Sequence, residues 1–203
     1  MPYVLGLTGN IASGKTTVGL MLLELGATTY VDADQVVHGL YLPGRPLVPR
    51  LVELFGQSIL TPEGGIDRAR LGELVFRDAA ALARLEAVVH PAVQAALVGT
   101  LRDLGPEDIG VLDAIKLVES GYAPFCHGLW VVTCPEEVQL DRLMQQRGLT
   151  LEQARVRLRA QPALAPRLAL ATEIIRNDGA LDYLRQQVVA GWQRFLVQTR
   201  GRP

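Results

Sequence analysis

The octapeptide G-N-I-A-S-G-K-T at residues 9–16 constrains the fold of this chain more than any other feature. It fits the phosphate-binding pattern G-x-x-x-x-G-K-[ST]. An apolar run over residues 3–8 precedes it and predicts a buried strand, and residues 17–25 form a helical pattern that ends at Gly26. A glycine-rich loop between a strand and a helix wraps a polyphosphate with its backbone N–H groups, and the helix N-terminus adds a favourable dipole. We therefore expect a nucleotide-binding site in this loop.

The scarcity of lysine favours a nucleotide-binding loop at residues 9–16. The alternative is a glycine-rich turn in which Lys15 is merely solvated. The chain has 20 lysine and arginine residues, yet only Lys15 and Lys116 are lysines. A compact ammonium suits a polyphosphate loop, whereas arginine presents a wide planar fork. In such a loop the lysine neutralises the β- and γ-phosphates of ATP, and the next hydroxyl, here Thr16, binds Mg²⁺. The predicted ATP-binding residues of the loop are Asn10, Ala12, Ser13, Gly14, Lys15, Thr16 and Thr17.

Composition narrows the class of protein further. With 203 residues and a net charge of −1, the chain is long enough for one domain with inserts and has no basic field for nucleic acid. No uninterrupted apolar run has membrane-spanning length, and the N-terminus has no signal-type segment. Cys126 and Cys134 are expected to be small buried side chains rather than a disulfide. We expect a cytoplasmic monomer or small homo-oligomer with no nucleic-acid or membrane partner.

Short apolar runs alternate with longer helical stretches, which is typical of a parallel α/β sheet. The predicted strands are residues 3–8, 28–32, 110–114, 129–133 and 173–176. The stretch between the second and third strands is too long for a single crossover helix, so we interpret it as a cap or substrate-binding insert. Its predicted helices are residues 47–55, 71–76, 79–89 and 92–104, with turns at Gly64-Gly65 and His90-Pro91. Further helices are predicted at residues 135–146, 151–160, 164–170 and 180–198.

Arginines gather in the last third of the chain. Five lie from Arg147 to Arg167 against one acidic residue, and Arg142 lies just upstream. Arg155 and Arg159 share one helical face. Guanidinium groups bind phosphate oxygens, and charge stabilisation provides most of phosphoryl-transfer catalysis. We predict that this segment closes over phosphates; the alternative is a solvated, arginine-rich helix face.

Carboxylates follow two of the predicted strands. In open α/β sheets the ligand crevice lies outside the carboxyl ends of the strands, so we expect Asp32 and Asp34 near the phosphate loop. One would orient or deprotonate an acceptor hydroxyl, and the other would cap the next helix or hold Mg²⁺ through water. A simple pair of helix-capping acids is the alternative. Asp113 ends the third predicted strand, which is the place for a Walker B-type acid, although apolar runs often end in aspartate.

Taken in order, these motifs resemble the dephospho-CoA kinase family over nearly the whole chain. Residues 6–18 are similar to the family's opening G-L-T-G-G-I-G-S-G-K-[ST]-T-V, and residues 32–34 match its D-A-D element. A phosphate loop alone is generic, whereas D-A-D, H-P and I-x-N-x-G in this order are much more specific. The further matches are residues 66–68, Val75-Phe76, Leu85-Glu86, His90-Pro91, Gln139, Arg142-Leu143, Arg147, Ala160-Gln161 and residues 175–179.

The resemblance implies an α/β fold: a five-stranded parallel-sheet P-loop NTPase core flanked by helices, with a helical acceptor-binding insert and an arginine-rich lid. On this basis the core comprises residues 1–34, 105–135 and 170–203, the insert residues 35–104 and the lid residues 136–169. The resemblance also implies transfer of the ATP γ-phosphoryl group to the ribose 3′-hydroxyl of dephospho-CoA, which is the last step of coenzyme A synthesis.

The resemblance carries roles onto single residues. Asp34 matches the family's proposed base, Arg142 and Arg147 belong to the lid side and handle phosphates, and Asn177 falls near the adenine of ATP. A His-Pro pair more often fixes a turn, so we give His90 a structural or acceptor-pocket role. The predicted catalytic residues are Lys15, Asp34 and Arg142, the acceptor-side residues are Asp34, His90 and Lys116, and the Mg²⁺ residues are Thr16 and, through water, Asp32.

The chain departs from the family pattern in several places. Asn10 and Ala12 replace two loop glycines, and Arg167 and Thr172 stand where lysine and aspartate are usual. The family's D-I-P-L-L-[FV]-E segment reads D-A-I-K-L-V-E at residues 113–119.

The lysine that enters this segment, Lys116, is either a phosphate or coenzyme A contact or a solvated loop residue. This segment keeps one alternative function open, a P-loop kinase for another small acceptor such as a nucleoside or nucleotide. A second alternative is a non-catalytic nucleotide-binding switch, against which the presence of Lys15, Thr16 and Asp34 argues.

Overall fold

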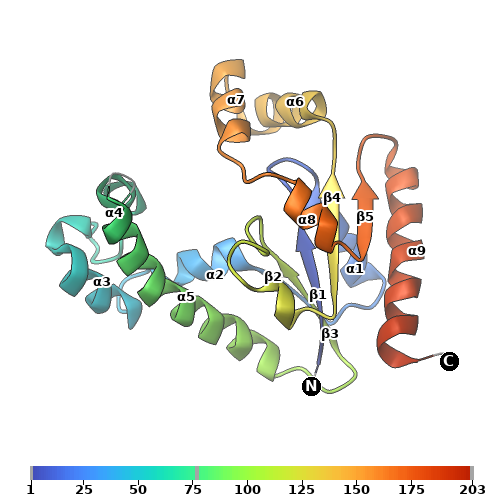
Figure 1. Ribbon diagram of the computed structural model, residues 1–203, viewed down its shortest axis with the longest axis horizontal. Coiled ribbons are helices and arrows are strands. Elements are labelled where there is room, and N and C mark those ends of the chain that lie inside the picture. Colours follow the sequence, from blue (N-terminus) through green and yellow to red (C-terminus); the bar gives the residue numbers. More distant parts are fainter. Residues whose placement is uncertain (1, 76–77, 202–203) are drawn as a thin grey trace. The chain divides into compact units, whose positions relative to one another are not determined.

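The computed structural model describes residues 2–75 and 78–201, and the chain divides into two compact units (Figure 1). The core unit comprises Met1–Val31 and Leu104–Pro203, and the insert unit comprises Asp32–Asp103. Each unit is described by itself below. The roles predicted for the insert and the lid stay predictions.

The core unit contains a five-stranded sheet with the strand order β2-β3-β1-β4-β5. Strand β1 is parallel to both β3 and β4, and β4 is parallel to β5. This confirms the predicted parallel α/β sheet, with every strand boundary within one residue of its prediction. The strands are β1 (Tyr3–Thr8), β2 (Thr29–Asp32), β3 (Ile109–Asp113), β4 (Gly128–Thr133) and β5 (Glu173–Arg176).

The strands at the centre of the sheet are buried on both faces, which explains why they are continuous apolar runs rather than alternating ones. Helices α1 (Lys15–Glu24) and α9 (Leu181–Arg200) contact each other; α1 also contacts β1 and β3, and α9 contacts β5. Their apolar side chains complete the hydrophobic core, in which Trp130 of β4 is almost fully buried. Helix α8 (Ala165–Leu170) contacts β4. The sheet therefore holds the loops at its carboxyl edge in fixed positions.

The segment predicted to be a lid forms two further helices with clear end signals. Helix α6 (Glu136–Arg147) follows Pro135, has two glutamates in its first turn and ends at Gly148, whose φ is 63°. Helix α7 (Leu151–Arg159) begins with a capping box between Thr150 and Gln153. A short 3₁₀ helix, η2 (Ala123–Phe125), lies between β3 and β4.

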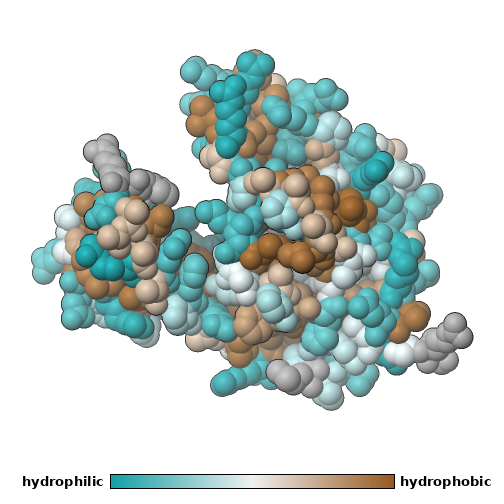
Figure 2. Space-filling model, viewed as in Figure 1, coloured by the Kyte–Doolittle hydropathy of each residue, from teal (hydrophilic) through white to brown (hydrophobic). Residues whose placement is uncertain are grey.

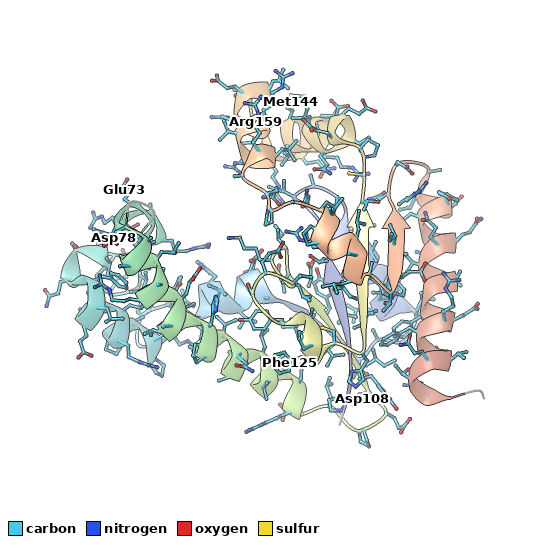
Figure 3. The ribbon with its side chains drawn as sticks, viewed as in Figure 1. Glu73, Asp78, Asp108, Phe125, Met144 and Arg159 are labelled. Carbon is cyan, nitrogen blue, oxygen red and sulfur yellow. The ribbon has the colours of Figure 1, made fainter. Side chains whose placement is uncertain are left out.

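The insert unit is organised around one long helix, α5 (Ala79–Arg102), which contacts α2, α3 and α4. Asp78, labelled in Figure 3, caps α5 by accepting a hydrogen bond from the Ala80 N–H at 2.8 Å. By length and composition α5 would also suffice to cross a membrane, but the core helix of a soluble protein passes the same test. The other elements are α2 (Ala33–Leu40), α3 (Leu47–Phe55), the 3₁₀ helix η1 (Gln57–Ile59) and α4 (Arg68–Val75).

The predicted turn at His90-Pro91 is wrong, because α5 continues through Pro91. Proline inside a helix removes one hydrogen bond and costs about 3 kcal/mol. Val89, Val93 and Leu97 are all buried, so the same helix face packs on both sides of the proline. Burial of these side chains offsets the local cost. The motif residue Phe76 lies outside the described residues.

Candidate active site

The phosphate loop connects β1 to α1, and the two glycines of its G-x-x-x-x-G-K-[ST] pattern each have a close neighbour. A Cβ atom on Gly9 would lie 2.3 Å from the carbonyl oxygen of Val132, and one on Gly14 would lie 2.0 Å from Nδ2 of Asn177. Gly14 is also the N-cap of α1, with φ at 97°. A side chain at residue 9 would collide with the backbone of Val132. A side chain at residue 14 would push the Asn177 amide out of its place, and φ there is unfavourable for any residue but glycine, so the loop conformation favours glycine at both positions.

Two other loop residues show how the backbone is held for a ligand. Ala12 has φ at 60°, a left-handed conformation that costs a residue with a Cβ about 1–2 kcal/mol. The Ser13 side chain is buried, and its Oγ has no hydrogen-bond partner within residues 2–75 and 78–201. The first turn of a helix leaves backbone N–H groups without intrahelical acceptors. A strained loop with donors at a helix N-terminus fits the phosphates of ATP.

Lys15 reaches the ends of two strands. Its Nζ donates to the carbonyl oxygen of Gly9 at 3.2 Å and lies 4.0 Å from an Asp113 oxygen. Tyr30, near the end of β2, donates its hydroxyl hydrogen bond to the other Asp113 oxygen. Asp113 is only 5% exposed, so the carboxylate is both oriented and shielded. The loop lysine, the β3 aspartate and the β2 tyrosine thus form one cluster at the carboxyl edge of the sheet.

Arg142 and Asn177, both predicted ATP residues, meet at the phosphate loop. Arg142 Nη1 donates to the carbonyl oxygens of Ala12 at 3.1 Å and Ser13 at 3.3 Å. Its Nη2 donates to Asn177 O at 3.2 Å and Oδ1 at 3.3 Å, and Asn177 Nδ2 donates to Ser13 O at 2.8 Å. The guanidinium therefore holds the carbonyl side of the loop. Its contact with phosphate stays a prediction.

Cys134 lies beside Arg142, with Sγ 3.8 Å from Nη1. Burial raises the pKa of this thiol above its ordinary value, although Arg142 acts in the opposite direction. Burial also raises the pKa of Cys126 to about 12. Both cysteines are free and only partly buried, where full burial was expected. Neutral thiols are poor nucleophiles.

The remaining arginines of the predicted lid fall into two groups. Arg147 is exposed at the end of α6, and the α7 arginines are exposed as well, including Arg159, labelled in Figure 3. Hydrophilic side chains lie on the front of α7 at the top of Figure 2, with hydrophobic ones beside them. Arg167 is different, because it is fully buried in α8. The prediction that the arginines from Arg147 to Arg167 all close over phosphates is therefore wrong for Arg167, which is packed beneath the surface.

The donor set for Mg²⁺ is oxygen-based, as this ion prefers. Thr16 and Thr17 are exposed in the first turn of α1, and the Asp113 carboxylate lies near Lys15 in the same unit. No group of three or more His, Cys, Asp or Glu side chains with metal-binding geometry occurs among the described residues. A hydroxyl and a carboxylate fit an ion that keeps several waters and takes its other ligands from substrate phosphates.

The aspartate pair lies in the insert unit, where the capping role of Asp32 is confirmed. Asp32 Oδ1 accepts hydrogen bonds from the N–H groups of Asp34 at 2.8 Å and Gln35 at 3.2 Å, which caps α2. Asp34 is exposed in the first turn of that helix. His90 is exposed in the middle of α5 and does not fix a turn. The functional roles of these three residues stay predictions.

Replacing Asp32 separates capping from metal binding. Asp32→Ala should lower the free energy of unfolding by about 1 kcal/mol, because it removes the cap, whereas Asp32→Asn should leave it nearly unchanged, since asparagine caps equally well. Thermal unfolding of the two variants measures the difference. Asp34→Ala is the matched control, as its side chain holds no backbone N–H. Equal losses in the alanine and asparagine variants would contradict the capping role.

Lys116 lies in the turn after β3 and is exposed. Its backbone carbonyl accepts from the Ser120 N–H at 2.8 Å, and its ammonium has no recorded partner within the described part of the chain. The geometry is compatible with either predicted role, so its contact with the acceptor stays a prediction.

Three residues of the site were missed in the sequence. Gln161 Oε1 accepts from the Ile11 N–H of the phosphate loop at 3.1 Å. Tyr30 orients Asp113, and Arg167 contacts Asn10. Gln161 and Arg167 had a sequence signal, since Gln161 belongs to the matched A-Q element and Arg167 stands where the family usually has lysine, but neither was assigned to the phosphate loop. Tyr30 precedes Asp32 by two residues at a strand end, but an aromatic residue there reads equally well as core.

Comparisons with known proteins agree with this geometry. The sequence model of the dephospho-CoA kinase family matches residues 3–182. A protein of Symbiobacterium thermophilum named dephospho-CoA kinase is 42% identical, over 98% of this chain and 84% of that protein. A Thermus thermophilus crystal structure superposes with a TM-score of 0.83 at 32% identity, covering 96% of this chain and 98% of that one. A Campylobacter jejuni dephospho-CoA kinase gives a TM-score of 0.59 at 27% identity, covering 96% and 97%. On the strength of the family match and the identity across almost its whole length, this chain belongs to the dephospho-CoA kinase family.

Proposed function

We propose that this protein transfers the γ-phosphoryl group of ATP to the ribose 3′-hydroxyl of dephospho-CoA, which yields coenzyme A. The observation that carries the proposal is the phosphate loop, whose carbonyl side is held by Arg142 and Asn177. Family membership favours this function over a kinase for another acceptor and over a non-catalytic switch. The reaction is assigned to the cytoplasm.

On the nucleotide side, the phosphates of ATP bind the N–H groups of residues 12–17, and Lys15 neutralises charge on the β- and γ-phosphates. Asn10 contributes its backbone to the start of the loop. Asn177 lies at the turn after β5, where it contacts Ser13 and Arg142. Its adenine-side role follows from the family resemblance. Arg142 and Arg147 stabilise the charge of the transferring group. Little covalent chemistry is required of the protein, so positioning and charge account for catalysis.

Mg²⁺ bound at this site would neutralise part of the negative charge on the phosphates. Thr16 would hold it directly, and Asp32 would hold it through water. Asp113 is a further oxygen donor near Lys15, and Tyr30 fixes its carboxylate.

On the acceptor side, Asp34 orients the 3′-hydroxyl and accepts its proton. The Asp34 carboxylate has no recorded hydrogen bond within residues 2–75 and 78–201, so it is available to a hydroxyl donor. His90 and Lys116 belong to the acceptor side as well. The insert unit exposes the apolar side chains Leu42, Leu54, Leu74 and Val98, which offer surface to a pantetheine arm. Binding energy from such an arm helps to hold the ribose for attack.

An acceptor panel tests the proposal. ADP release is measured with dephospho-CoA, AMP, CMP, adenosine and shikimate, and the product is checked for a 3′-phosphate by phosphorus NMR. We expect the highest kcat/KM with dephospho-CoA, because both the ribose and the pantetheine arm contribute binding energy. A higher kcat/KM with any other acceptor would overturn the assignment and direct attention to residues 114–117.

A further inference from the structure

Arg167 is a fully buried cation that the reaction as described does not use. Its side chain is 0% exposed. Nε donates to Oε1 of Glu119 at 2.9 Å, and Nη1 donates to Oδ1 of Asn10 at 2.9 Å. The third nitrogen, Nη2, has no hydrogen-bond partner among the residues that the structure describes. Arginine stays protonated in proteins, so a full positive charge lies beneath the phosphate loop.

The two partners of Arg167 belong to the loops that follow two neighbouring strands. Asn10 lies in the phosphate loop after β1, and Glu119 lies in the segment after β3. β1 and β3 pair in parallel, so both loops leave the same edge of the sheet. Helix α8, which carries Arg167, contacts β4 on the other side of β1. One guanidinium therefore joins three segments that are far apart in the sequence.

Stability does not account for this arrangement. The Glu119 side chain is 31% exposed, so solvent screens its attraction to Arg167. Replacing even a fully buried ion pair by well-packed apolar side chains is often neutral or stabilising. A buried donor without an acceptor, such as Nη2, is a further cost to the folded state. The guanidinium fixes the relative positions of its two acceptors, because its planar fork donates to them in fixed directions. A lysine ammonium is a single point charge and would not fix both directions.

We propose that Arg167 is a positioning residue of the nucleotide site, acting through Asn10 to fix the first turn of the phosphate loop before ATP binds. Two other contacts hold the same turn: Gln161 accepts from the Ile11 N–H, and Lys15 donates to the Gly9 carbonyl. Donors that are already oriented need no reorganisation when phosphate charge develops. The inference rests on the proposed function only in naming ATP as the nucleotide.

A double-mutant cycle tests it with Arg167→Met, Asn10→Ala and the two combined. Calorimetry measures the affinity for Mg²⁺ with the non-hydrolysable analogue AMP-PNP, without any acceptor, and steady-state kinetics give kcat and KM for ATP. We expect each single variant to lose about 10- to 100-fold in analogue affinity and in kcat/KM for ATP, the scale of a misplaced reacting group. The double variant should lose no more affinity than the more damaged of the two single variants. Arg167→Lys should keep only part of the wild-type affinity.

The control is Arg185→Met, which removes a surface ion pair with Glu24 and should behave as wild type. Additive losses in the cycle would contradict action through Asn10, and wild-type affinity in Arg167→Met would overturn the proposal. If Arg167→Met does not fold, Asn10→Ala and Arg167→Lys must still show the loss. A wild-type protein that binds the analogue but leaves dephospho-CoA unphosphorylated contradicts the proposed function alone, and the binding cycle still decides the role of Arg167.

Discussion

Lys15→Ala is expected to lower kcat by about 10²–10³-fold while the protein stays folded, because it removes the ammonium that neutralises phosphate charge in the transition state. The Lys15 side chain is 11% exposed and ends 4.0 Å from Asp113. Without it, ATP phosphates would approach the Asp113 carboxylate without the positive charge of the lysine. Coupled ADP-release kinetics measure the loss, and circular dichroism confirms the fold.

The matched variant is Lys15→Arg, which keeps the charge but replaces a point charge by a planar fork. The shielded position of Lys15 leaves little room for a larger head group, so we expect only partial recovery. Tyr30 continues to orient Asp113 in both variants, which separates loss of charge from loss of the aspartate. Wild-type turnover in Lys15→Ala with an unchanged circular dichroism spectrum would remove the basis of the nucleotide site.

The sequence was sufficient for features that depend on local pattern. Apolar runs located the three central strands, β1, β3 and β4, because these are buried on both faces and contain few polar residues. The two edge strands, β2 and β5, are only partly buried, and they were found from shorter apolar runs. The phosphate loop followed from glycines that the structure shows in contact with Val132 and Asn177, where a Cβ would not fit. The family resemblance assigned Arg142 to the lid side and Asn177 to the adenine of ATP. That both residues form hydrogen bonds at the phosphate loop was found only in the structure.

Features that depend on tertiary packing were not predictable in the same way. His90-Pro91 reads as a turn locally, yet buried valines on both sides keep α5 continuous. Arg167 reads as one more member of a basic segment, because nothing local indicates that Asn10 and Glu119, far away in the chain, surround it. A one-dimensional charge pattern cannot distinguish an exposed lid arginine from a buried one.

Asp34→Asn is expected to lower kcat by about 10²–10⁴-fold, the usual contribution of a general base, and to leave affinity for AMP-PNP with Mg²⁺ unchanged. The amide has nearly the same shape as the carboxylate but cannot accept the hydroxyl proton. The variant should also fold normally, because the cap of α2 is supplied by Asp32 rather than by Asp34. Single-turnover measurements with dephospho-CoA separate the chemical step from product release.

Asp32→Asn is the matched control, since it makes the same chemical change two residues earlier. Asparagine keeps the hydrogen bonds to the N–H groups of Asp34 and Gln35, so α2 should begin in the same place. If Asp32 acts as a cap and holds Mg²⁺ only through water, its variant loses less kcat than Asp34→Asn. A larger loss of kcat for Asp32→Asn than for Asp34→Asn would show that the two roles are exchanged, and the first aspartate of the pair would then be the base.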